Sequence, residues 1–143
     1  MEYVLRNATD DDILLLKEYK KNIIGEYASN LSESEINDIN DYVERSVLQD
    51  LVNYRIILIN NLMVGCYLLS NNDDGVLLDE IYIDEKFRNN GIGTKIIKEV
   101  IKANNVVYLW VYKLNVKAIN LYKKLGFKII GETESRFYMK YVK

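Results

Sequence analysis

The residues from Asp84 to Thr94 carry the clearest chemical signal in the sequence. This segment holds two glycines, Gly91 and Gly93, between a strand-like run and a helix-like run. Glycine lets the backbone approach a ligand closely, and the unpaired amides at the start of a helix attract anions. The segment is therefore suited to binding phosphate or pyrophosphate oxygens.

Two common phosphate-binding motifs do not match this segment. A P-loop requires Gly-Lys-Ser/Thr at its end, but Gly93 is followed by Thr94 and Lys95. A dinucleotide fingerprint requires a third glycine where Ile96 stands. Taken alone, the turn also fits a strand-to-helix connection that binds no ligand.

The sequence resembles the GNAT acetyltransferases in two segments. Arg88-Asn89-Asn90-Gly91-Ile92-Gly93 is similar to the acyl-CoA motif Arg/Gln-x-x-Gly-x-Gly/Ala. The second signature, Asn-x-x-Ala-x-x-Leu-Tyr-x-x-x-Gly-Phe, is similar to the segment from Asn115 to Phe127. Both segments occur in the order found in the family, with one helix and one strand between them. Together they are much more specific than either alone.

The resemblance implies acetyl-CoA as the co-substrate and no metal. The backbone amides from Arg88 to Thr94 would hold the pyrophosphate, and the strand before the turn would pair with the pantetheine arm as an added strand. Asn115 would hydrogen-bond this arm, although an Asn there is also a good helix N-cap. The expected cofactor-binding residues are Ile81, Tyr82, Ile83, Arg88, Asn89, Asn90, Gly91, Ile92, Gly93, Thr94, Asn115, Ala118 and Tyr122.

Tyr122 is the expected general acid, because the resemblance places it where the thiolate of CoA leaves. A phenol has a reference pKa of ~10, so it is protonated and able to donate at neutral pH. The alternative is that Tyr122 only packs, since it shares an apolar stripe with Ala118 and Leu125.

Asp79 and Glu80 are the candidates for the general base. The chain has no histidine, so another group must take the proton from the amine. Glu80 is the first choice and Asp79 the second, with a water relay as a further route. Side chains alternate along a strand, so we expect only one of the two to face the acceptor cleft. Alternatively, both are partly exposed carboxylates that only aid solubility.

The acceptor is expected beneath two N-terminal helices that are rich in acidic residues. These are Glu26, Glu33, Glu35, Asp38, Asp41 and Glu44. An acidic rim would favour a cationic amine such as a polyamine, an aminoglycoside or a lysine side chain, but a solvated helix face explains most of these residues more simply. Trp110 stands where the family members that acetylate ribosomal protein N-termini carry Glu. We expect Trp110 in the core or on the wall of the acceptor pocket.

The elements that position these residues follow the order β-α-α-β-β-β-α-β-α-β-β. Helices are expected after Thr9, after Ser32 with Glu35 completing a capping box, from Gly91, and from Asn115. The fold class is α/β: a single GNAT-like domain over residues 1–143, with a mixed, mostly antiparallel central sheet flanked by helices.

Composition narrows the remaining possibilities. The net charge of −2 gives no basic field for nucleic acid, and no apolar run reaches membrane-spanning length. Cys66, the single cysteine, is expected in the core. These features favour a cytoplasmic protein, and the Asn-, Ile- and Lys-rich composition is typical of an AT-rich bacterial genome. A homodimer is compatible with the resemblance.

The expected function is direct acetyl transfer from acetyl-CoA to a small cationic primary amine. One alternative is acetylation of a protein lysine or N-terminus. The other is a non-catalytic acyl-CoA-binding module.

Overall fold

The computed structural model describes residues 2–28 and 30–143, which form one seven-stranded sheet with helices on both faces. The strand order is β1-β2-β3-β4-β5-β7-β6, and only β4 and β5 run parallel. The expected mixed, mostly antiparallel sheet is confirmed. The strands are β1 Val4–Asn7, β2 Tyr54–Ile59, β3 Leu62–Asn72, β4 Gly75–Ile83, β5 Val106–Tyr112, β6 Lys128–Glu132 and β7 Arg136–Val142.

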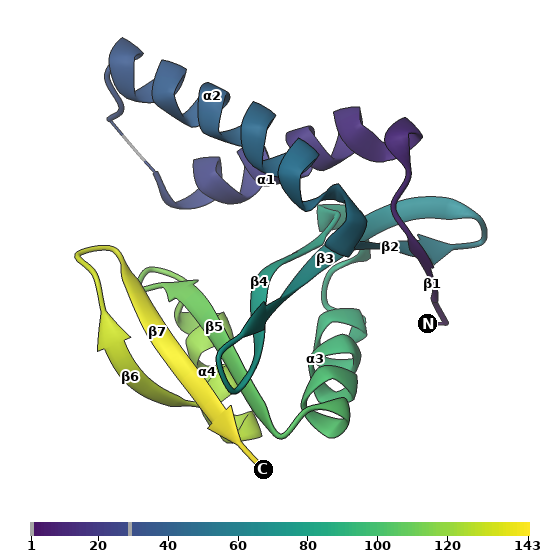
Figure 1. The fold of residues 1–143 in the computed structure, drawn as a ribbon, viewed down its shortest axis with the longest axis vertical. Coiled ribbons are helices and arrows are strands. Elements are labelled where there is room, and N and C mark those ends of the chain that lie inside the picture. The colour runs from purple at the N-terminus through teal and green to yellow at the C-terminus, as the bar shows by residue number, and fades with distance from the viewer. Residues whose placement is uncertain (1, 29) are drawn as a thin grey trace.

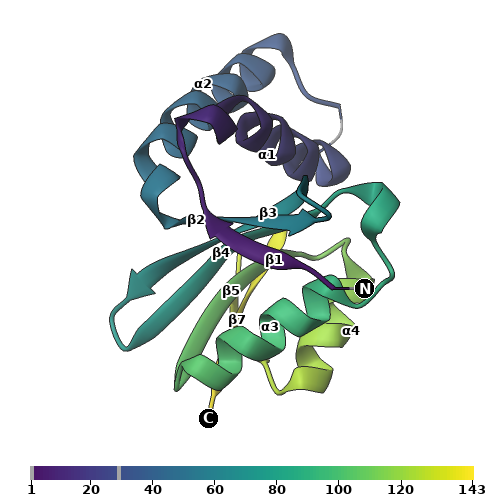
Figure 2. The same cartoon turned by 90° about the vertical axis from the view of Figure 1, so that its right-hand side faces the viewer.

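Two pairs of helices cover opposite faces of the sheet (Figures 1 and 2). On one face, α1 (Ile13–Tyr27) and α2 (Glu33–Asp50) pack through Leu16 and Val43 on β2 and β3. On the other face, α3 (Ile92–Ala103) and α4 (Val116–Leu125) pack through Ile96 and Ile119. The expected order of elements is confirmed.

Hydrogen bonds at the N-termini of α1 and α2 stabilise these helices near the residues where the sequence predicts that they begin. Ser32 accepts a hydrogen bond from the Glu35 amide at 3.1 Å, and the Glu35 carboxylate accepts one from the Ser32 amide at 3.2 Å. At Thr9 the structure differs slightly, because a short 3₁₀ turn over Asp10–Asp12 precedes α1. Asp12 accepts a hydrogen bond from the Thr9 amide at 2.8 Å and pairs with Arg6 at 2.8 Å.

A bulge in β4 opens the sheet at its centre. Leu68 pairs with Glu80 while the adjacent Leu69 pairs with Leu78, so Asp79 is an extra residue on β4. Pairing between β4 and β5 ends at Leu78. Beyond this point the two strands diverge, and the edge of β4 that faces β5 is free of strand partners as far as Ile83.

Gly65 is required by the close approach of β3 to β4. A Cβ atom added at this position would lie 2.2 Å from the carbonyl oxygen of Tyr82. We therefore expect Gly65→Ala to lower the free energy of unfolding by about 2 kcal/mol or more, measured by denaturant titration. Gly25 in α1 is the control because a Cβ there meets nothing within 4 Å, so Gly25→Ala should stabilise the helix slightly. Equal stability of the two variants would contradict this packing.

Candidate active site

A cleft of about 1200 Å³ lies where β4 and β5 diverge. It is lined by α1, α2, β4, the turn over residues 84–91 that leads into α3 (the glycine turn), α3, β5, α4 and the start of β7. All of the expected catalytic and cofactor-binding residues line it except Asn90. The divergence of the two strands thus brings both signature segments and both candidate carboxylates to one opening.

The glycine turn presents the start of α3 to this cleft. Gly91 has a φ of 78° and is the N-cap of the helix, and Asn89 has a φ of 65°. A Cβ added at Gly91 or Gly93 would meet no protein atom within 4 Å. At Gly93, where φ is not positive, the protein's own packing does not demand glycine, so the space beside it fits an external group such as a pyrophosphate.

Side chains of the turn hold it in shape. Asn90 does not line the cleft, and its side chain donates to the carbonyls of Phe87 and Arg88, both at 3.3 Å. Arg88 donates through Nε to the carbonyl of Ile83 at 2.7 Å and pairs with Glu26 at 3.0 Å. The side chains of Asn90 and Arg88 therefore brace the turn. The Arg88 amide is paired with the Glu85 carbonyl at 3.3 Å, so the backbone amides from Asn89 to Thr94 are the ones available to a ligand.

Filling the space beside Gly93 should block cofactor binding without unfolding the protein. We expect Gly93→Leu to raise the Kd for acetyl-CoA at least tenfold, because the new side chain projects into open space that a ligand would otherwise use. Isothermal titration calorimetry measures this, and Gly25→Ala, outside the cleft, is the control. An unchanged Kd with an unchanged melting temperature would show that the turn does not hold the cofactor.

Asn115 and Ala118 lie together at the start of α4. The Asn115 side chain accepts a hydrogen bond from the Ala118 amide at 3.3 Å, so the expected N-cap is confirmed. Both residues also line the cleft. The Asn115 amide group is therefore at the cleft wall, and a role in holding the pantetheine arm stays a prediction.

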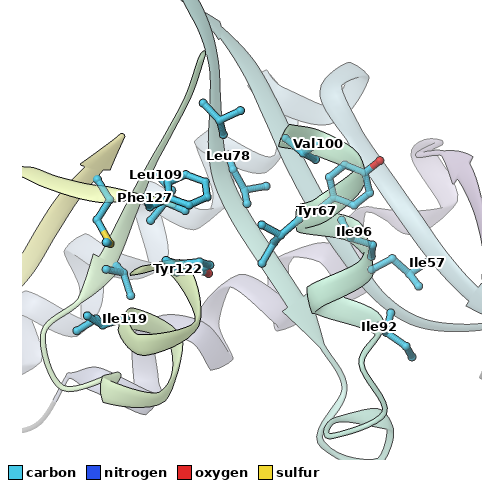
Figure 3. Close-up of a cluster of buried hydrophobic side chains, with 14 of the residues drawn as sticks. Ile57, Tyr67, Leu78, Ile92, Ile96, Val100, Leu109, Ile119, Tyr122 and Phe127 are labelled. Atoms are coloured by element: carbon cyan, nitrogen blue, oxygen red, sulfur yellow. The ribbon is translucent and has the colours of Figure 1, made fainter. Parts of the chain in front are cut away.

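Tyr122 reaches the cleft from the last turn of α4, packed among apolar side chains (Figure 3). Its ring lies against Phe127 with centroids 5.7 Å apart, and it is 8% exposed. Burial raises the pKa of the phenol to about 12, so the hydroxyl keeps its proton at neutral pH. Within the described residues its hydroxyl has no hydrogen-bond partner, which leaves it free to donate into the cleft.

Asp79 and Glu80 line the same cleft, so the expectation that only one would face it is wrong. Leu78 and Ile81 both pack into the core beneath α3, although simple alternation would place them on opposite faces. The bulge at Asp79 accounts for this, since two neighbouring residues then share the face covered by α1 and α2.

Glu80 is buried and is held at one oxygen. Its Oε2 accepts a hydrogen bond from the Tyr54 hydroxyl at 2.6 Å and lies 3.6 Å from Lys20 Nζ. Its Oε1 is buried with no partner among the described residues. Burial raises the pKa of the Glu80 carboxyl, while Lys20 and Tyr54 oppose the rise. The unpartnered oxygen is a suitable acceptor for a proton or for an ammonium group.

Sequence reasoning missed Lys20, Tyr54 and Arg136, which lie around these carboxylates. Lys20 and Arg136 line the cleft, and Tyr54 lies behind Glu80. One signal was available: Lys20 falls on the buried face of its helix, one turn after Leu16, where an apolar residue is the rule. A charged residue in that place indicates a buried partner.

Most of the acidic residues considered for a rim lie on an exposed helix face away from the cleft, in agreement with the simpler of the two interpretations. Of the six acidic residues named for the rim, only Glu26 lines the cleft, and it is paired with Arg88. Glu44 pairs with Lys17, and Glu35 caps its own helix. Trp110 does line the cleft, stacked on Tyr138 with centroids 4.4 Å apart.

Other expectations concern residues outside the cleft. Cys66 is fully buried, which confirms a core thiol, and burial raises its pKa. In the described part of the chain, no helix is long and apolar enough to cross a membrane. The same residues include no cluster of three or more His, Cys, Asp or Glu that could hold a metal ion.

Comparison with known families identifies the class of this protein. The acetyltransferase (GNAT) family model matches residues 13–127, which is most of the chain. The chain therefore belongs to the GNAT acetyltransferase family.

Relatives and solved structures are similar over different extents. A Bacillus subtilis (strain 168) spermine/spermidine N(1)-acetyltransferase is 33% identical over 45% of this chain and 46% of its own length. A mouse thialysine N-epsilon-acetyltransferase is 44% identical over 41% of the chain and 38% of its own length. The alignments thus span less than half of these relatives. The PaiA N-acetyltransferase of Thermoplasma acidophilum, solved with coenzyme A, shares the fold over the full length of both chains, with a TM-score of 0.81 and 20% identity.

Proposed function

We propose that this protein is an N-acetyltransferase that moves an acetyl group from acetyl-CoA directly to the primary amine of a small molecule. One observation carries the proposal: Tyr122, Glu80 and the N-terminus of α3 all line one cleft. The named relatives acetylate spermine or spermidine and thialysine, which supports a small amine as the acceptor.

Two features fit acetyl-CoA: the open space beside Gly91 and Gly93, and the edge of β4 that has no strand partner. When bound, acetyl-CoA supplies an activated acyl carbon. The backbone amides at the start of α3 would hold its pyrophosphate, and residues 81–83 would pair with its pantetheine arm.

The protein's own groups would handle the two protons of the transfer. Glu80 Oε1, directly or through a water, takes a proton from the ammonium so that the amine can attack. The C–N bond forms, the C–S bond breaks, and the Tyr122 hydroxyl donates its proton to the departing sulfur. The second proton that the nitrogen loses as the amide forms then restores the Tyr122 hydroxyl, directly or through a water. Holding amine and thioester side by side supplies much of the acceleration, and the route needs no covalent intermediate on the protein.

The test is thiol release from acetyl-CoA across a panel of polyamines, aminoglycosides, amino acids and lysine peptides. The one cysteine is buried, so the protein itself adds little background to a thiol reagent. Release with a small amine supports the proposal, whereas release with lysine peptides alone would favour a protein acceptor. Binding of acetyl-CoA with no release for any amine would favour a non-catalytic module and overturn the proposal.

A further inference from the structure

Four charged side chains surround the acceptor end of the cleft. Asp79 and Glu80 are negative, and Lys20 and Arg136 are positive. Lys20 is 8% exposed, lies 3.6 Å from Glu80, and has its Nζ 5.0 Å from the centre of the Tyr42 ring. The charges balance, so this end of the cleft has no excess of negative charge to attract a polycation.

Arg136 differs from the other cations of the cleft because its charged group has no hydrogen-bond or ion-pair partner among the described residues. Arg88 is paired with Glu26, Lys20 lies beside Glu80, and Lys117 contacts the Asn89 side chain. Within the described residues, Arg136 makes neither an ion pair nor a side-chain hydrogen bond. Its guanidinium carbon lies 4.8 Å from the centre of the Trp110 ring, which leaves the donor edge free for an anion.

The backbone of Arg136 is fixed in place. Its amide donates to Thr133 Oγ1 at 3.0 Å, and its carbonyl accepts from the Thr133 amide at 2.8 Å. On its other side, Arg136 pairs with Tyr112 at the end of β5. The Arg136 charge also opposes the rise in the pKa of the Asp79 carboxyl, which is consistent with a position near the two carboxylates. The guanidinium therefore approaches a bound acceptor from a rigid strand.

We infer that the acceptor is an amine that also carries a carboxylate, as an amino acid does. Its ammonium lies at Glu80, and its carboxylate binds the guanidinium of Arg136 against Trp110. A guanidinium presents two parallel donors that match a carboxylate. A polyamine would instead bring further positive charge beside Lys20 and Arg136. This inference rests on the proposed function and names the substrate class of the same site.

Amino acids and their decarboxylated counterparts provide the test. Lysine and ornithine are compared with cadaverine and putrescine by kcat/KM, using the unmodified protein and acetyl-CoA. We expect the amino acids to be preferred at least tenfold. Arg136→Met should raise KM for the amino acids by roughly tenfold to a hundredfold, as loss of charge-assisted hydrogen bonds predicts, and should not weaken the diamines, because it removes a positive charge that repels them. Arg136→Lys should restore part of the preference.

The matched control is Lys140→Met on the same strand. Lys140 lies 3.8 Å from Asp74 and over the Tyr108 ring, outside the cleft, so its loss should change neither class of acceptor. Equal or better turnover of the diamines by the unmodified protein would overturn the inference, as would an amino-acid preference that survives in Arg136→Met. Failure of the proposed function looks different: no amine of either class would be acetylated.

Discussion

Replacing Tyr122 with Phe should lower kcat by about a hundredfold or more and leave the affinity for acetyl-CoA unchanged. The hydroxyl is the only group removed, and a positioned general acid typically contributes at least this much. The ring still packs against Phe127, so the core beneath α4 should stay intact. Steady-state kinetics give kcat, and calorimetry gives the affinity.

Tyr138 provides the control for this substitution. Its hydroxyl accepts a hydrogen bond from Asn72 at 3.2 Å, and it does not line the cleft. Tyr138→Phe should therefore keep kcat within about twofold. If Tyr122→Phe turned over as fast as the unmodified protein, Tyr122 would have no part in the proton transfer.

Replacing Glu80 with Gln should lower kcat/KM about a hundredfold at neutral pH and remove the part of the rise of kcat/KM with pH that comes from ionisation of Glu80. Burial raises the pKa of Glu80, so in the unmodified protein the basic form, and with it the rate, increases as pH rises through that pKa. Glutamine can still accept the hydrogen bond from Tyr54, but it cannot take up a proton. The measurement is kcat/KM against pH for both proteins.

Asp79→Asn distinguishes the two carboxylates. Asp79 shares the cleft but is exposed, and it accepts no hydrogen bond from Tyr54. If Glu80 is the base, Asp79→Asn should keep the pH dependence and most of the rate. The reverse pattern, with Asp79→Asn slow and Glu80→Gln normal, would assign the proton transfer to Asp79.

The order of elements could be predicted from local sequence patterns. The Ser32 and Glu35 capping box, the glycine turn before α3 and Gly126 after α4 each act within a few residues, so their outcome is visible in sequence. The cofactor side of the cleft was predictable for the same reason, because both of its signatures are short and continuous.

The acceptor side could not be predicted in the same way. Nothing in Leu78-Asp79-Glu80 marks a bulge, because the extra residue appears only when β4 is paired with β3. Likewise, Lys20, Tyr54 and Arg136 come from α1, β2 and β7, so only the folded sheet places them at one site. The charge balance there depends on these long-range contacts rather than on local composition.

Direct acetyl transfer to an amine is most directly tested by following a labelled acetyl group. Acetyl-CoA labelled with carbon-13 in the acetyl group is incubated with the protein and the best amine of the panel, and mass spectrometry then examines amine and protein together. The predicted result is label on the amine in amounts equal to the thiol released, with none on the protein. Thiol release without labelled amine, or label that first accumulates on the protein, would contradict direct transfer in this cleft.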